Sequence, residues 1–340
     1  MNKKAQGEQF NWIFVIVSGA IILGFFTMFT FQYITLQEKR QHVESLRFFG
    51  NVLGIAEKLN IGGSGSSVNS YDTQGLRFGY NVPLEYYCDE TDARIIIGGK
   101  NKDFIPSYNL KDEVVFINEK MIVNGLDLGL MPWKFPFQIT NFIYLSDPKK
   151  QYYAVYDQSS KEYVDNLEEK YSVIFNLFND GSINRYEKTE INKLKPKENS
   201  KIIIFSNRKP SENKIKELIG ENKNVNLIYV DYNNKKINYF EDDNFGEDID
   251  YYSDEIMLGA FFTDNQENYQ CSINRAKKKL STVAVHYSER TKLLKRVDTK
   301  TTCQYDLIDN SLVSLAKGNY EVVENLRQQN NQGAGCLWVF

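Results

Sequence analysis

The amino-acid sequence predicts an α+β protein that begins with a transmembrane helix. Three observations support this: an uncharged apolar run near the N-terminus, short β-branched and aromatic segments in the middle, and helical periodicity toward the C-terminus. We expect an anchor and stalk, a β-rich part, a Rossmann-like βα layer and a helical, disulfide-linked C-terminal part. The net charge of −3 gives no global signal for nucleic acid, and two histidines leave little material for histidine-based catalysis.

Residues 10–36 are expected to cross a bilayer once, after a basic tail over residues 1–9. No charged residue lies from Gln9 to Gln37, and roughly 20 apolar residues are enough to span the hydrocarbon core. Trp12 and Tyr33 lie near the two ends, where membrane-interface aromatics are enriched. The alternatives are a cleaved signal sequence, for which the run is long, and a buried helix of a soluble protein.

Small residues mark one face of this helix. Ala20 and Gly24 are four positions apart, a spacing that lets two membrane helices pack closely, so self-association through this face is one prediction. Small residues are also common in membrane helices that do not pair. Basic residues flank both ends of the run almost equally, so the charges do not decide the orientation.

Several short motifs resemble a known group of sequences. They are QG at 6–7, FNWIF at 10–14, NYQCS at 268–272 and GCLWVF at 335–340. Together they resemble uncharacterised single-pass membrane proteins of small-genome archaea, and the resemblance implies a membrane location without a known activity. A weaker similarity is to type IV pilin-like precursors, from which this chain differs because Glu8 follows Gly7 directly.

Residues 37–61 are expected to continue as a stalk helix, and the Gly/Ser-rich stretch 62–70 is expected to be a flexible linker. Residues 71–157 contain short β-branched and aromatic runs separated by turn residues, which is typical of strands. Among them, MPWKFPF (131–137) could form an exposed recognition loop. We favour aromatics that fold back into the core.

Residues 158–265 predict a parallel sheet covered by helices. The strands KIIIFSN and VNLIYVDY flank the helix PSENKIKELIGEN, and continuous apolar strands of this kind are buried on both faces. SVIFNLF (172–178) and EIMLGAFFT (255–263) are expected to be further strands. The dinucleotide-binding fingerprint is missing from this layer.

Polar residues follow these strands. If the layer held an active site, the side chains at the carboxyl ends of its strands would form it; the candidates are Ser206, Asn207, Asp231 and Asp264. Separately, Asp157 and Ser159 match part of an Asp-x-Ser-x-Ser metal motif, but Lys161 replaces the last hydroxyl. A lysine there would repel a cation, so we do not expect a metal.

Residues 266–340 are expected to be helical, with shorter helices over 304–316 and 319–330. An antiparallel hairpin of these two would bring Cys303 close to Cys336 and leave Cys271 for Cys88, although two other pairings of four cysteines remain open. Such disulfides would place the domain in an oxidising space outside the membrane. The alternative is four reduced, buried cysteines in a cytosolic domain.

Two segments are strongly charged. The stretch 275–300 is basic and could bind envelope proteins or an anionic polymer, although a solvated face near the acidic loop is the plainer interpretation. The acidic stretch 241–255 does not match an EF-hand, and a looser Ca²⁺ loop is the less favoured alternative.

The sequence therefore predicts a single-pass protein of the cell membrane with an extracytoplasmic C-terminal domain and a structural or interaction role in the cell envelope. We expect no catalytic activity and no cofactor, and partners limited to the lipid bilayer and envelope components, without nucleic acid. The alternatives are a membrane-tethered enzyme that uses the α/β layer, and a subunit of a pilin-like filament.

Overall fold

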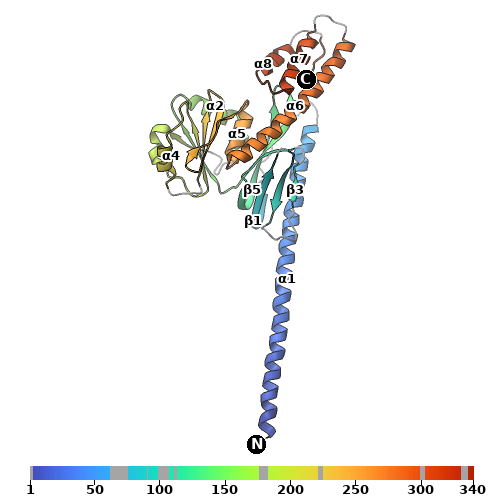
Figure 1. The fold of residues 1–340 in the computed structure, drawn as a ribbon, viewed down its shortest axis with the longest axis vertical. Helices are drawn as coiled ribbons and strands as arrows, with labels where there is room; N and C mark the ends of the chain where they lie inside the picture. The colour runs from blue at the N-terminus through green and yellow to red at the C-terminus, as the bar shows by residue number, and fades with distance from the viewer. Residues whose placement is uncertain are drawn as a thin grey trace. The chain divides into compact units, whose positions relative to one another are not determined.

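The computed structural model describes residues 3–61, 76–89, 91–98, 107–110, 113–175, 183–220, 225–298, 303–330 and 336–340. The chain divides into two compact units, Met1–Asn51 and Val52–Phe340. Helix α1 spans Lys3–Ile61, so the predicted transmembrane segment and stalk belong to one continuous helix (Figure 1). The predicted linker at 62–70 lies outside the described residues. We refer to the described part of the second unit from β1 onward as the body.

The first sheet of the body has six strands in the order β3-β2-β1-β5-β6-β4. Their bounds are β1 (Leu76–Cys88), β2 (Ala93–Ile97), β3 (Ser107–Asn109), β4 (Val114–Phe116), β5 (Lys120–Lys134) and β6 (Gln138–Ser146). Neighbours are antiparallel except β4 and β6, which are parallel. Side chains of β2 alternate between buried and half-buried, as expected when one face of a sheet packs on a core.

The second sheet has seven strands. Their bounds are β7 (Gln151–Tyr156), β8 (Asn184–Glu187), β9 (Ser200–Phe205), β10 (Val225–Asp231), β11 (Lys236–Glu241), β12 (Asn244–Phe245) and β13 (Ile249–Asp250). The order is β12-β11-β10-β9-β7-β8, and β13 also pairs with β11. Strands β8, β7, β9 and β10 are parallel, and β11 runs antiparallel to β10. The chain leaves β7 to one side to form β8 and returns past it to form β9.

Helices cover both faces of this second sheet. One face packs against the 3₁₀ helix η2 (Lys188–Lys193) and α4 (Glu212–Ile219), through side chains such as Ile191 and Ile215. The other face packs against α2 (Lys161–Lys170), α3 (Ser172–Phe175) and α5 (Asp254–Phe262). All six side chains of β9 are buried, which explains its uninterrupted apolar run.

Two predicted strands are wrong. Residues 172–175 form helix α3, because the amides of Ile174 and Phe175 bond to the carbonyl of Tyr171 and continue the turn that ends α2. Residues 254–262 form helix α5, whose start is capped by Ser253, which accepts a bond from the Ile256 amide. Seven of its nine residues are buried, so no helical stripe is visible in the sequence.

The C-terminal part contains α6 (Gln266–Val297), α7 (Tyr305–Ala316) and α8 (Val322–Asn330), which lie together in orange and red in Figure 1. Asn265 caps α6 by accepting a bond from the Asn268 amide at 2.8 Å. Apolar residues recur along α6 at a spacing of three and four. Ile273, Ala276 and Leu280 are buried and Val283 and Tyr287 are half-buried, and the helix contacts α7 and strand β4. The helical prediction for this part is therefore confirmed.

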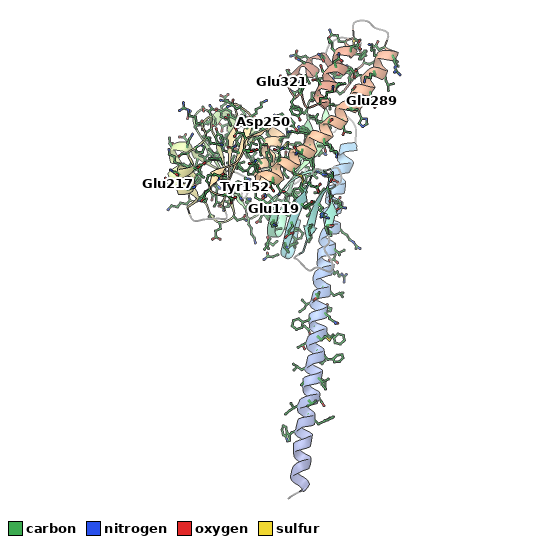
Figure 2. The ribbon with its side chains drawn as sticks, viewed as in Figure 1. Glu119, Tyr152, Glu217, Asp250, Glu289 and Glu321 are labelled. Atoms are coloured by element: carbon green, nitrogen blue, oxygen red, sulfur yellow. A yellow bond between two sulfur atoms is a disulfide. The ribbon has the colours of Figure 1, made fainter. Side chains whose placement is uncertain are left out.

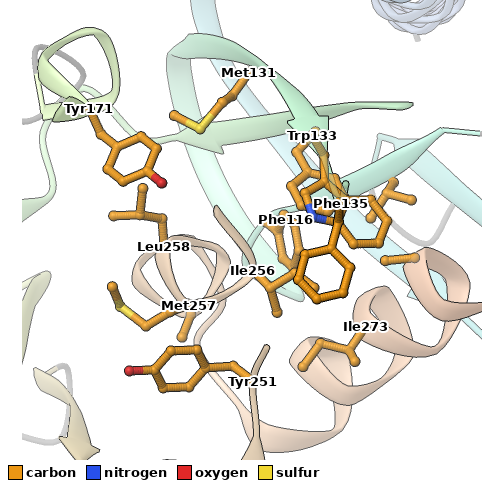
Figure 3. Packing of buried hydrophobic residues seen from close by; sticks show 14 of the residues in the cluster. Phe116, Met131, Trp133, Phe135, Tyr171, Tyr251, Ile256, Met257, Leu258 and Ile273 are labelled. Atoms are coloured by element: carbon orange, nitrogen blue, oxygen red, sulfur yellow. The ribbon is translucent and has the colours of Figure 1, made fainter. Parts of the chain in front are cut away.

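One aromatic core joins these elements. Figure 3 shows Phe116 of β4 and Trp133 of β5 packed beside Ile256 of α5 and Ile273 of α6. The expectation for MPWKFPF is confirmed, because Trp133, Phe135 and Phe137 are 0, 8 and 4 % exposed. The two sheets and the C-terminal helices therefore share one core.

Candidate functional site

The four cysteines form two disulfides. Cys88 at the end of β1 pairs with Cys271 in the second turn of α6, and Cys303 pairs with Cys336. This is the pairing expected from the sequence. The first disulfide links the first sheet to α6 across 183 residues, and the second closes a segment of 33 residues around α7 and α8.

Helix α1 contains the one stretch, among the described residues, that is long and apolar enough to cross a membrane. It covers Phe14–Gln37 with a mean hydropathy of 2.2, and none of it is buried. Trp12 and Tyr33 are 70 and 65 % exposed. Ala20 and Gly24 are exposed as well, and no atom lies within 4 Å of a Cβ built on Gly24. A signal sequence near an N-terminus would meet the same criteria of length and composition.

A polar network lies at the carboxyl edge of the parallel strands, with Asp157 at its centre. Ser159 donates to Oδ1 of this carboxylate at 2.6 Å, and Ser206 donates to Oδ2 at 2.7 Å. Ser160 adds its backbone amide at 3.0 Å and its hydroxyl at 3.1 Å. Residues that follow β7 and β9 thus meet through one carboxylate, because these strands are neighbours although 49 residues separate Asp157 from Ser206.

Lys188 completes this network from the end of β8. Its Nζ donates to the Ser206 hydroxyl at 2.8 Å and lies 4.0 Å from Oδ2 of Asp157. Burial alone raises the pKa of Asp157, but hydrogen bonds from Ser159, Ser206 and Ser160 outweigh burial and hold that pKa below its usual value. The carboxylate is therefore ionised at neutral pH.

This arrangement corrects the reason for expecting no metal beside Asp157. Lys161 was expected to repel a cation, but it is an exposed first residue of α2. The ammonium of Lys188 instead lies beside the carboxylate. Among the described residues, no group of three or more His, Cys, Asp or Glu side chains could hold a metal ion, and this includes the acidic stretch 241–255.

The same edge opens into a cleft of about 770 Å³ between η2, α4 and the end of β7. Its charged lining comprises Asp157, Glu187, Lys188, Lys214 and Glu217. Figure 2 labels Glu217 on α4. The apolar part of the lining comes from Ile191, Leu194 and Leu218. A cleft of this size, with charged groups of both signs in its lining, is suited to a small polar ligand.

The Ser206 hydroxyl is not positioned for nucleophilic attack. Ser206 is 0 % exposed, and its hydroxyl both donates to Asp157 and accepts from Lys188. A catalytic serine must reach its substrate, which this hydroxyl does not. Exposed polar side chains lie beside it, such as Asn207, which donates to Ser159 at 3.4 Å.

The residues predicted for this edge are placed there in part. Asn207 follows β9 and accepts a bond from Asn233, and Asp231 ends β10 and accepts the Asn234 amide at 3.0 Å. Asp264 is elsewhere: it accepts the Glu119 amide at 3.0 Å, and its charge acts on Lys150 and Lys201, which lie where β7 and β9 begin, at the opposite edge. The sequence missed Lys188, since it follows a four-residue strand and belongs to no motif.

Two lysines are buried at that opposite edge. Lys150 donates to Asn226 at 3.2 Å, and burial lowers its pKa to about 8. Lys201 donates to the carbonyl of Thr263 and lies over the ring of Tyr239, and burial followed by repulsion from Lys150 lowers its pKa well below the usual value. Their side chains are 2 and 0 % exposed, so we assign both lysines to the core.

The basic segment 275–300 does not present one continuous charged face. Arg275 is 9 % exposed and donates to the carbonyls of Leu110 and Glu113. Lys292 and Lys295 pair with Asp309 and Asp306 of α7. The acidic stretch pairs with other lysines: Asp248 with Lys209 and Lys236, and Asp254 with Lys170.

Comparison with known proteins gives no relative: no family model, curated protein or solved structure matches the chain.

Proposed function

We propose that this chain is a single-pass membrane protein of the cell envelope, with the body outside the membrane in an interaction role. The observation that carries the proposal is the combination of an exposed apolar stretch of 24 residues in α1 with two disulfides in the body. Disulfides persist in oxidising compartments and are rare in a reducing cytosol. An anchor that keeps the body in such a compartment accounts for both features.

The second sheet supports an interaction role for the body. Its order β8-β7-β9-β10 would suit a Rossmann-like, doubly wound layer, in which ligands bind where successive connections leave a strand in opposite directions. That point lies between β7 and β9, where Asp157 and Ser206 meet. In this proposal the cleft beside them holds a small polar group of a ligand or envelope partner, and the buried serine orients Asp157 rather than reacting.

The location can be tested with cysteine substitutions in the full-length protein on intact cells. Lys278→Cys lies on the exposed surface of α6, and Lys3→Cys lies before the apolar run. A membrane-impermeant maleimide should label Lys278→Cys and leave Lys3→Cys unlabelled. The four natural cysteines should react only after unfolding and reduction. Protein released by alkaline carbonate, or free natural thiols in unreduced cells, would refute the proposal.

A further inference from the structure

Large apolar side chains are exposed where α6 ends and the C-terminal tail begins. Leu293, Val297 and Trp338 are 58, 76 and 68 % exposed, and Leu337 is 48 % exposed. We call these four residues the Trp338 patch. Apolar residues scattered singly over a surface are ordinary, so these four mark an interaction site only if they lie together.

Hydrogen bonds show that the tail runs beside α6. Arg290, Leu293 and Val297 are spaced by three and four residues, so they lie on one side of the helix. Arg290 donates to the carbonyl of Trp338 at 3.4 Å. Further along, the Leu337 amide donates to the hydroxyl of Tyr305 at 3.1 Å, and this hydroxyl donates to Asp298 at 2.7 Å. The tail therefore follows the helix from Arg290 to the residue after Val297.

The tail is fixed in place, so the exposure of Trp338 is imposed by the fold. Cys336 is bonded to Cys303, and Val339 is 0 % exposed. Asn330 accepts the Val339 amide at 3.1 Å. The ring of Phe340 packs 5.1 Å from that of Phe137. The Trp338 indole is therefore held in water between the disulfide of Cys336 and the buried Val339. A partner that covered it would bury apolar area that the fold leaves exposed.

The charges around the patch favour a second copy of the chain over a strongly charged surface. Glu289 (labelled in Figure 2) and Arg290 are exposed and of opposite sign, and Arg296 is exposed one turn further on. Lys292 and Lys295 are already paired with acids of α7. A two-fold arrangement places the same patch on both partners, so Glu289 of each copy can face an arginine of the other.

We propose that two copies of this chain associate through the Trp338 patch. Trp and Arg are the residue types that most often dominate the binding energy of an interface, and both are present here. The contact would bury apolar area on both copies at once. If the chain is anchored as proposed above, copies in one membrane are also held at a high effective concentration, but the contact itself does not depend on the anchor.

Sedimentation of the full-length protein in detergent tests the proposal. The wild-type protein should dimerise, and Trp338→Asp or Leu293→Asp should weaken the dimer at least tenfold. Ile122→Asp is the matched control, because Ile122 is 73 % exposed on β5 outside the patch. It should leave the dimer unchanged. Gly24→Leu, which alters the small-residue face of α1, should also leave it unchanged.

Three results would overturn the inference. The first is a wild-type protein that stays monomeric at all concentrations. The second is a dimer that survives both Trp338→Asp and Leu293→Asp, whether or not Gly24→Leu removes it. The third comes from vesicles with brominated acyl chains: tryptophan quenching that is weaker in Trp338→Phe than in the wild-type protein would show that the bilayer covers the patch instead.

Discussion

Replacing Gly259 with alanine tests how tightly α5 packs on the first sheet. A Cβ at this position would lie 2.3 and 2.4 Å from two ring atoms of Phe116, more than 1 Å inside an ordinary carbon contact of about 3.5 Å. The ring cannot move away easily, because Phe116 is 0 % exposed and lies within 6.1 Å of the rings of Phe142, Tyr144 and Tyr269.

The expected magnitude follows from two opposing terms. Alanine is the better helix former by about 1 kcal/mol, whereas overpacking a filled core costs roughly 1–3 kcal/mol and sometimes more. With an overlap this large we expect Gly259→Ala to lower the free energy of unfolding by about 2 kcal/mol. Urea unfolding followed by circular dichroism measures it.

A double variant shows whether the clash is the cause. Phe116→Leu removes ring atoms that the new Cβ would meet, so the combined variant should be less destabilised than the sum of the two single variants, by about 1 kcal/mol. If Gly259→Ala matched or exceeded the wild-type stability, the packing between α5 and β4 would be looser than described, and the argument would fail.

Three further predictions concern the stability of the body. Burial lowers the pKa of Lys150 from 10.5 to about 8 in the folded protein. Between pH 8 and 10.5 the unfolded chain therefore binds one more proton than the folded protein, so the free energy of unfolding should rise with pH. From pH 7.5 to 9.5 the free energy of unfolding, measured with urea, should rise by about 2 kcal/mol more in the wild-type protein than in Lys150→Met. An equal rise in both proteins would contradict the lowered pKa of Lys150. Replacing both Cys88 and Cys271 with serine should lower the free energy of unfolding by about 5 kcal/mol, because this disulfide links residues 183 apart. Replacing both Cys303 and Cys336 should lower it by about 4 kcal/mol, because that disulfide closes 33 residues. If calorimetry found the second pair of substitutions more costly, the loop-entropy estimate would be wrong. Ser206→Ala should cost about 1–2 kcal/mol, because it removes a buried hydroxyl bonded on both sides, whereas an unchanged melting temperature would show that the network adds little.

The sequence alone predicted the helices and strands whose residue pattern is local. The apolar run of α1 and the helical periodicity of α6 depend on the spacing of neighbouring residues, and the structure has helices at both places. Strands β9 and β10 were also predicted, since their continuous apolar runs are bounded by turn residues. The same rule failed for residues 254–262, because an apolar run that is almost wholly buried fits a helix and a strand equally well.

The tertiary structure decided how distant residues meet. Asp157, Lys188 and Ser206 follow three different strands, and only the order β8-β7-β9 makes them neighbours. Asp264 lies away from this network and accepts the Glu119 amide, because the apolar run before it is helix α5 and not a strand of the sheet. Local periodicity fixes which face of an element is apolar, but strand order depends on how those faces pack together, and this is a property of the whole chain.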